Sequence, residues 1–173
     1  MPRQSRPRQS RRPDESWRGV RVPLDERDRQ LLGHLQGDAR VTSVELARRL
    51  RLSTPGLQKR LRKLEARGVI QRYATLVSRH AVGLELLCFV QVSLAHHRPG
   101  SVERFPDRIR GMREVLECHY LTGEVDYLLK VVVATHQDLE RFLFEKLMKV
   151  PGVDRIRTSI VLKEIKTSTA LPL

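Results

Sequence analysis

The chain has 173 residues, enough for one large domain or two small ones, and its 40% hydrophobic content is sufficient for packed cores. No apolar run approaches the roughly 20 residues that span a bilayer, and the arginine-rich N-terminus lacks the apolar stretch of a secretory signal, so we expect a cytoplasmic protein without a membrane partner. The net charge of +13 favours an anionic partner, and charge alone leaves DNA, RNA and an anionic membrane surface open.

The positive charge is concentrated in the first half of the chain. Residues 1–22 hold seven Arg against two acidic residues (+5), and residues 23–80 hold thirteen basic against six acidic residues (+7). Three Pro and the lack of hydrophobic periodicity predict that residues 1–22 form a disordered basic arm. Such an arm is either a solvated tail or a segment that follows DNA phosphates beside the binding site.

Two short helices are expected after this arm. The first spans about residues 25–36, with Asp25 as its N-cap and Asp28 completing an imperfect capping box. Ser43 opens the second helix, which runs to a tight turn at Arg51 and Leu52. The apolar faces are formed by Leu31, Leu32 and Leu35 in the first helix and by Val44, Ala47 and Leu50 in the second.

The third helix, capped by Ser53 and ended by Gly68, has two different faces. Leucines recur at i, i+4 and i+7 on one side, and the opposite side is cationic and polar. Together the three helices form a helix-turn-helix, whose third helix enters the major groove of duplex DNA. The leucines are Leu57, Leu61 and Leu64, and the polar side carries Gln58, Lys59, Arg62 and Lys63.

The DNA contacts follow from position on these helices. The N-terminal end of the third helix should lie nearest the bases, where Gln58 can pair with adenine and Lys59 or Arg62 with guanine. Arginines on the neighbouring segments are better placed to contact phosphates, which position the protein without specifying sequence. The candidate DNA-binding residues are Arg48, Arg49, Ser53, Thr54, Pro55, Gln58, Lys59, Arg62, Lys63 and Arg72.

The remainder of the chain predicts a hinge and a second domain. Residues 69–76 are expected to form a strand or wing; the hinge covers residues 71–83, between the helix-turn-helix domain (residues 23–70) and the second domain (residues 84–173). The order βαββαβ is typical of a ferredoxin-like sandwich, so the chain as a whole is α+β. The expected strands are residues 84–94, 115–121, 126–134 and 154–166, and the expected helices are residues 101–111 and 137–149. The apolar set of the last helix is Leu139, Phe142, Leu143, Leu147 and Met148.

Two helices can cover only one face of this sheet, and the other face is expected to be apolar too. The first strand places Leu87 and Phe89 opposite its valine-rich side, and the third strand places Leu128 and Val132 there. An apolar sheet face of this size predicts burial against a second copy of the chain. We therefore expect a homodimer formed through the C-terminal domain.

Cysteines and histidines give little support for other chemistry. Cys88 and Cys118 lie inside predicted strands and are expected to be small core residues rather than a disulfide. The six histidines lack helical ligand spacing, and His96 and His97 fall in a predicted loop, so we expect no metal site. The chain also lacks a glycine-rich phosphate loop and the G-x-S-x-G motif of a nucleophilic serine.

Four stretches, in this order and spacing, resemble the Lrp/AsnC (feast/famine) family of transcriptional regulators. They are LDERDRQLLGHLQGDAR, ELARRLRLSTPGLQKRLRKLEARGVIQRY, YLTGEVDYLLKV and KVPGVDRIRTSIVLKEIK. The resemblance covers about residues 23–173 and leaves out the arginine-rich arm. It implies a winged helix-turn-helix domain joined to a ligand-binding domain, and a sequence-specific DNA-binding regulator that is not an enzyme.

The resemblance also implies partners and an effector site. It implies a dimer that often assembles into a tetramer or octamer, and double-stranded DNA carrying an imperfect palindrome as operator. It implies no cofactor, but an amino acid or related metabolite bound at interfaces between dimers, near a Gly-x-x-Asp loop. In this chain the corresponding residues are Thr122, Gly123, Val125 and Asp126 in the loop, and Thr158, Ser159 and Ile160 on the last strand.

Two alternatives stay open at this point. Siroheme decarboxylases resemble the same two-domain fold, and such an enzyme would use C-terminal histidines and would not need a cationic recognition helix. A DNA-compacting architectural protein would bind duplex with little dependence on sequence. The basic bias of residues 23–80 argues against the enzyme.

Overall fold

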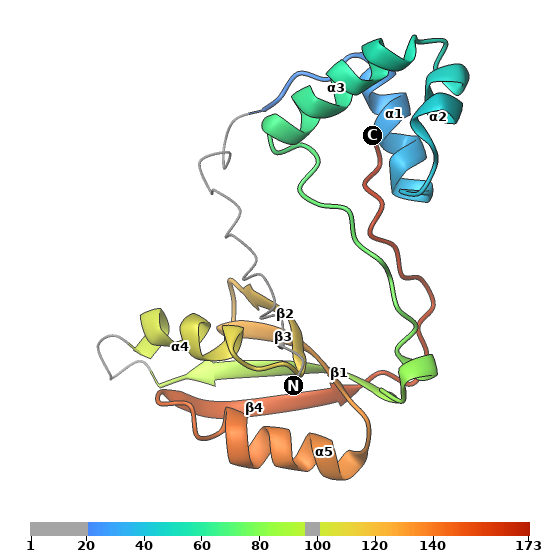
Figure 1. Cartoon of the computed structure of the whole chain (residues 1–173). Coiled ribbons are helices and arrows are strands. Elements are labelled where there is room, and N and C mark those ends of the chain that lie inside the picture. The colour runs from blue at the N-terminus through green and yellow to red at the C-terminus, as the bar shows by residue number, and fades with distance from the viewer. Residues whose placement is uncertain (1–20, 96–100) are drawn as a thin grey trace, which may run out of the picture. The chain divides into compact units, whose positions relative to one another are not determined.

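The computed structural model describes residues 21–95 and 101–173, with the backbone alone for residues 101–104. The chain divides into two compact units. One unit comprises the described residues through Thr75 together with Ser168–Leu173, and the other comprises Leu76–Thr167 (Figure 1). Residues 168–173, which we expected within the C-terminal domain, therefore cluster with the helical unit. The predicted basic arm lies outside the described residues, apart from its last two positions.

Three helices form the first unit: α1 (Glu26–Gly37), α2 (Ser43–Arg49) and α3 (Thr54–Ala66). The predicted capping box of α1 is confirmed, because the Asp25 carboxylate accepts the Asp28 N–H and the Asp28 carboxylate accepts the Asp25 N–H. Thr42 caps α2, and Ser53 caps α3 as expected. These caps satisfy N–H groups that have no partner inside a helix, and they fix where each helix begins.

A leucine-rich core joins these three helices. Its fully buried members include Leu31, Leu46 and Leu57, and Leu35 and Leu61 pack against it partly buried. Val44 was predicted to face this core, but its side chain is 69% exposed. Leu46 is buried instead, because α2 turns the face that carries Leu46, Ala47 and Leu50 toward the core.

Residues 69–76 do not form the expected strand. The N–H groups of Val69 and Ile70 bond to the carbonyl of Leu64 at the end of α3, and both side chains pack against the helical core. Residues 71–78 have no regular structure, since none of the described segments offers their backbone a strand to pair with. Val69 and Ile70 thus close the end of α3, and residues 71–78 connect the helical unit to the sheet.

The second unit is a four-stranded antiparallel sheet in the order β2-β3-β1-β4. The βαββαβ order predicted from the sequence is confirmed. The strands are β1 (Leu86–Leu94), β2 (Val115–Tyr120), β3 (Tyr127–Val133) and β4 (Val153–Ile160), and the helices are α4 (Ser101–Arg110), α5 (His136–Arg141) and the π-helical η3 (Phe142–Leu147), with a short 3-10 turn, η2 (His80–Val82), before β1. No described helix is long and apolar enough to cross a membrane.

The last strand is shorter than predicted. Ile160 pairs with Cys88, and the Val161 N–H bonds to the carbonyl of Leu87, which lies next to the first residue of β1. Beyond that point β1 offers no further partner, so the expected continuation to Lys166 has no ladder to join. Strand β4 therefore ends at Ile160, and residues 161–173 have no regular secondary structure.

The core of this unit lies between the sheet and its helices. Cys88, Val90 and Val92 of β1 meet Phe105 and Phe142 of the helices, all at 0–1% exposure. Met148 was predicted to belong to this core, but it is 38% exposed. The π-helical turn explains the difference, because the Met148 N–H reaches back five residues to Leu143 and so breaks the 3.6-residue spacing.

The face of the sheet away from this core is mixed rather than uniformly apolar. Phe89 is 37% exposed there, beside Lys130 of β3, whose ammonium lies 2.9 Å from the Glu117 carboxylate of β2. Leu87 and Val132 are already buried within the unit. Arg155 and Arg157 of β4 pair with β1 residues of this face and are exposed. The face thus combines an apolar patch with a cationic edge.

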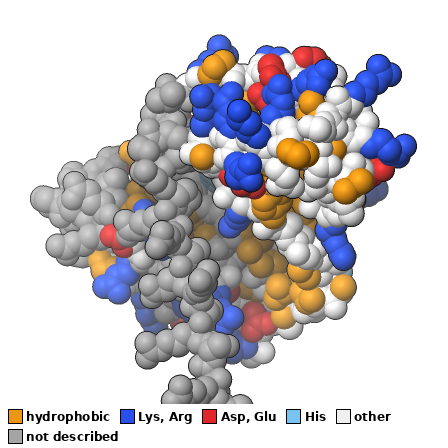
Figure 2. Space-filling model, turned by 45° about the horizontal axis from the view of Figure 1, so that its top comes forward, with side chains coloured by type: hydrophobic (Ala, Val, Ile, Leu, Met, Phe, Trp, Pro, Cys, Tyr) orange, Lys and Arg blue, Asp and Glu red, His pale blue; other side chains and the backbone are white. Residues whose placement is uncertain are grey.

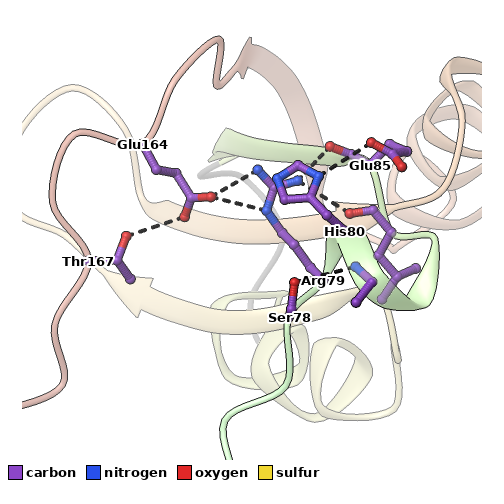
Figure 3. A network of polar contacts seen from close by, with 8 residues as sticks. Ser78, Arg79, His80, Glu85, Glu164 and Thr167 are labelled. Atoms are coloured by element: carbon purple, nitrogen blue, oxygen red, sulfur yellow. Dashed lines mark hydrogen bonds and ion pairs between the residues drawn. The ribbon is translucent and has the colours of Figure 1, made fainter.

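One ion-pair network ties together the segments that enter and leave the sheet (Figure 3). The Arg79 guanidinium donates to the Glu164 carboxylate at 2.9 and 3.1 Å and to the carbonyl of Glu85 at 2.5 Å. The Thr167 hydroxyl donates to the same Glu164 side chain. The Arg79 hydrogen bond holds the pKa of Glu164 below its ordinary value, so this carboxylate stays charged at neutral pH.

Candidate nucleic-acid interface and effector site

The cationic side chains of α3 point in two directions. Lys59, Arg62 and Lys63 are exposed, and within the described residues none of them forms an ion pair. Arg60 instead turns back to α1, where its Nη1 lies 2.6 Å from the Asp25 carboxylate and 2.7 Å from the Asp28 carboxylate. The outward side of α3 therefore carries positive charge that no described ion pair compensates.

Arg60 serves the fold rather than the surface. The Asp28 side chain is 7% exposed, and a carboxylate so buried needs a partner for its charge. The hydrogen bond from Arg60 lowers the pKa of Asp25, and the two carboxylates raise the pKa of Arg60. Both effects favour the charged pairs that hold α3 against α1.

The two arginines of α2 are engaged with an acid. Arg48 and Arg49 each lie 2.8 Å from the same oxygen of Glu45. These hydrogen bonds lower the pKa of Glu45 to about 2, so the carboxylate is ionised throughout the physiological range. Both guanidinium groups remain exposed and keep donors for a phosphate, and Arg72 is also exposed on the connector after α3.

The N-terminal end of α3 is built around Ser53. Its hydroxyl accepts the N–H of Gly56 at 3.2 Å. A Cβ at position 56 would lie 3.0 Å from that oxygen, so glycine leaves room for the cap. Thr54 and Pro55 are exposed in the first turn of α3. Because Ser53 already accepts a hydrogen bond, its hydroxyl is free to donate to a phosphate.

Gln58 has a partner that the sequence did not indicate. Its amide nitrogen donates to the hydroxyl of Ser43 on α2, at 2.7 Å, and both side chains are half-buried. Fifteen residues separate the two positions, so only the packing of α2 on α3 brings them together. No helical periodicity or cap pattern signals such a contact.

The predicted DNA contacts all belong to the helical unit, on α2, on α3 and its cap, or on the connector after α3. Figure 2 shows Lys and Arg side chains predominating over acidic ones on the presented surface of this unit. An exposed cationic helix face suits a polyanionic duplex, in which phosphates supply most of the attraction.

The Gly-x-x-Asp loop joins β2 to β3. Gly123 has a φ of 117°, a conformation that favours glycine, and Thr122 and Gly123 are exposed. One carboxylate oxygen of Asp126 accepts the N–H of Leu94 at 2.7 Å, and the Asp126 N–H donates to the carbonyl of Val92. Asp126 therefore anchors the loop to the end of β1, and its second oxygen forms no hydrogen bond among the described residues.

The second predicted effector segment lies apart from this loop. Thr158 pairs with Val90 and Ser159 with Phe89, on the opposite edge of β1 and farther along it than Val92. Because side chains alternate along a strand, the hydroxyls of Thr158 and Ser159 point to opposite faces of the sheet. A single chain does not bring the loop and both hydroxyls into one pocket.

Other chemical features are sparse in the part of the chain that the structure describes. No group of three or more His, Cys, Asp or Glu residues could hold a metal ion there. Cys88 is buried as expected and Cys118 is exposed, contrary to the prediction; both are free thiols. Cys118 lies on the edge strand β2, where it lines a shallow pocket with Ile109 and Arg110 of α4 and stays open to solvent. His96 and His97 lie outside the described residues.

Two family models match the chain. Residues 24–71 match a winged helix-turn-helix DNA-binding domain, and residues 87–171 match the Lrp/AsnC ligand-binding domain. The leucine-responsive regulatory proteins of Klebsiella pneumoniae and Escherichia coli K12 are each 38% identical over 148 residues, which cover 86% of this chain and 90% of the relative.

Solved structures give the same result. A transcriptional regulator from Neisseria meningitidis, in complex with L-methionine, is 39% identical with a TM-score of 0.83, covering 87% of this chain and 97% of that one. A feast or famine regulatory protein from Mycobacterium tuberculosis, also complexed with L-methionine, is 35% identical with a TM-score of 0.78, covering 86% and 99%. These relatives are named as regulators and not as enzymes.

Proposed function

Since the chain belongs to the Lrp/AsnC family of transcriptional regulators, we propose that α3 reads an operator in double-stranded DNA and that an amino acid bound to the C-terminal domain modulates this binding. One observation carries the DNA assignment. Lys59, Arg62 and Lys63 share an exposed face of α3 and form no ion pair among the described residues, while Arg60 on the same helix is paired with two carboxylates. A helix with this division of charge fits the major groove.

The position of each candidate on the helices supports its proposed role at the DNA. Thr54, Pro55, Gln58 and Lys59 occupy the first turns of α3 and face the base edges, with Arg62 beyond them. Phosphates are contacted by the remaining candidates, which position the protein on the duplex. These are Arg48, Arg49, Ser53, Lys63 and Arg72.

The effector proposal rests on the loop and on the relatives. Gly123 lets the backbone approach a ligand, and the free oxygen of Asp126 can accept a hydrogen bond from an α-ammonium group. Thr158, Ser159 and Ile160 are too far along β4 to complete this pocket in the same chain. We therefore place the complete site, including Thr122 and Val125, between copies of the chain in a dimer-based tetramer or octamer in the cytoplasm.

Selection of duplexes from a random library tests the DNA assignment. We expect enrichment of one imperfect palindrome, because two copies of α3 in a two-fold dimer contact two half-sites about one helical turn apart. If the selection enriches no common sequence and all duplexes bind with equal affinity, the chain would instead be a DNA-compacting architectural protein.

Calorimetric titration with individual L-amino acids tests the effector assignment, with D-enantiomers as controls. We expect heat of binding for at least one L-amino acid, including L-methionine among the candidates. Asp126→Asn should weaken it, because the amide oxygen can still accept the Leu94 N–H while the charge is lost. Asp154→Asn, an exposed position on β4, is the control. Absence of binding by all the amino acids would refute an amino-acid effector.

A further inference from the structure

We infer that Ser43 determines sequence specificity indirectly, by fixing the side-chain amide of Gln58 in the orientation that recognises adenine. The inference rests on the proposed reading of DNA by α3 and adds a residue that lies on a different helix. Its basis is the 2.7 Å hydrogen bond from the Gln58 amide nitrogen to the Ser43 hydroxyl.

The Gln58 amide can still bind a base while it is bonded to Ser43. The nitrogen of Gln58 carries two hydrogens, and Ser43 accepts only one of them. The second hydrogen and the amide oxygen remain available, which is one donor beside one acceptor. Adenine presents N7 as an acceptor beside its N6 amino donor, so the pattern is complementary. Guanine presents two acceptors, and a fixed amide would hold its oxygen against one of them.

Ser43 is free to play this part because another residue caps its helix. The Thr42 hydroxyl accepts the N–H of Glu45 at 3.2 Å and so satisfies the first turn of α2. The Ser43 hydroxyl is therefore not needed for capping. Both Ser43 and Gln58 are half-buried, so water competes less for their hydrogen bond than it would on an open surface.

A purely structural role for the contact makes a different prediction. The packing of α2 on α3 already depends on Leu46, Ala47 and Leu57, which are 0–3% exposed. If the Ser43–Gln58 hydrogen bond only supported that packing, its loss would lower stability and reduce affinity for every duplex alike. A positioning role instead changes the preference between bases at one position of each half-site.

The experiment compares base preferences of the full chain on its selected operator. Each A·T pair of a half-site is replaced in turn by G·C, and the affinities of wild type, Ser43→Ala, Ser43→Thr, Gln58→Ala and the double variant are measured by fluorescence anisotropy. Circular dichroism of each variant verifies the fold.

We expect wild type to prefer adenine about tenfold at one pair, which is within the usual range for a bidentate contact. Ser43→Ala and Gln58→Ala should each lose this preference, and the double variant should lose no more than either. Ser43→Thr, which keeps the hydroxyl, should retain most of it, and Ser43→Ala should bind scrambled duplex with the affinity of wild type.

Two results would overturn the inference and leave the proposed function intact. In the first, Ser43→Ala keeps the adenine preference that Gln58→Ala loses. In the second, Gln58→Ala keeps every base preference of wild type. If wild type itself selects no operator, both the inference and the proposed reading of DNA fail.

Discussion

Lys59 and Arg60 are neighbours in the chain and carry the same charge, yet they do different work. Lys59 is exposed on the outer face of α3, and Arg60 bonds to two carboxylates of the α1 cap. The difference arises from the 100° rotation per residue of a helix, which turns one side chain to solvent and the next toward α1. At the scale of single residues, charge alone therefore does not identify a DNA contact.

Arg60→Ala should destabilise the helical unit by about 2–3 kcal/mol, because it leaves the nearly buried Asp28 carboxylate without its partner. Urea unfolding followed by far-ultraviolet circular dichroism, at fixed protein concentration, measures the change. Arg62→Ala, which removes an exposed charge from the same helix, should cost less than about 0.5 kcal/mol. Equal losses for the two variants would contradict the assignment of Arg60 to the fold.

The ion pair between Arg60 and Asp25 makes the stability of the helical unit depend on pH. The pKa of Asp25 is below its ordinary value when folded, so its contribution to stability is present above the ordinary carboxyl pKa. The contribution is lost as the pH falls through the lowered pKa. Urea midpoints taken between about pH 6 and about pH 2.5 should therefore fall less steeply in Arg60→Ala than in wild type.

Glu45 holds two of the proposed phosphate contacts, Arg48 and Arg49. Glu45→Gln should release them and raise affinity for any duplex by about two- to fivefold, as expected for a surface ion pair. Anisotropy titrations measure the affinity. Glu65→Gln removes the same charge from the same unit without releasing an arginine, since Glu65 bonds to Tyr73. Equal gains in the two variants would mean that net charge alone is responsible.

At the residue scale, the sequence predicted what depends on local spacing. The caps at Asp25 and Ser53 follow from residues three positions apart, and the structure confirms both. The contacts Ser43–Gln58 and Arg60–Asp28 join positions 15 and 32 residues apart. Such contacts depend on how helices pack, and a single sequence carries no direct signal of that geometry.

At the scale of elements, the turn between α2 and α3 holds one residue in a left-handed conformation. Arg51 has a φ of 52°, and it is the one described residue other than glycine with a positive φ. The Leu52 N–H returns to the carbonyl of Ala47, so the turn is closed by the backbone itself. A side chain in this left-handed conformation is strained by contact between Cβ and the following carbonyl.

Arg51→Gly should therefore stabilise the helical unit by up to about 1 kcal/mol, since the relief of strain exceeds the added freedom of the unfolded chain. Arg67→Gly is the matched control, because Arg67 has the same charge but a φ of −88° at the end of α3. It should be neutral or destabilising. Urea unfolding compares the two, and equal effects would contradict strain at Arg51.

The segments that sequence periodicity placed incorrectly have two causes. Residues 69–76 and 161–166 have strand-like composition, but no described strand lies beside them to complete a ladder. Met148 left the core because η3 adopts a π-helical turn. Periodicity reports which residues share a face of a regular element, and it does not report where a partner ends or a helix widens.

At the scale of the whole molecule, the uncovered sheet face is the expected dimer contact. Phe89→Glu would bury a carboxylate where the two copies of this face are expected to meet. It should therefore convert the dimer to the 20.0 kDa monomer, as measured by light scattering after size exclusion. Phe144→Glu, on the exposed side of η3, should leave the dimer intact. A dimeric Phe89→Glu would place the interface elsewhere.

Operator binding by a variant that lacks the two outward cations Lys59 and Arg62 is the most direct test of the proposed function. Fluorescence anisotropy compares the selected operator with a scrambled duplex, for wild type, Lys59→Ala/Arg62→Ala and the control Lys149→Ala/Lys166→Ala, which removes two exposed lysines from the second unit. We expect the first variant to lose about 100-fold in affinity for the operator and most of its preference over the scrambled duplex, with the dimer unchanged. A variant that still prefers the operator as wild type does would show that another surface reads the DNA.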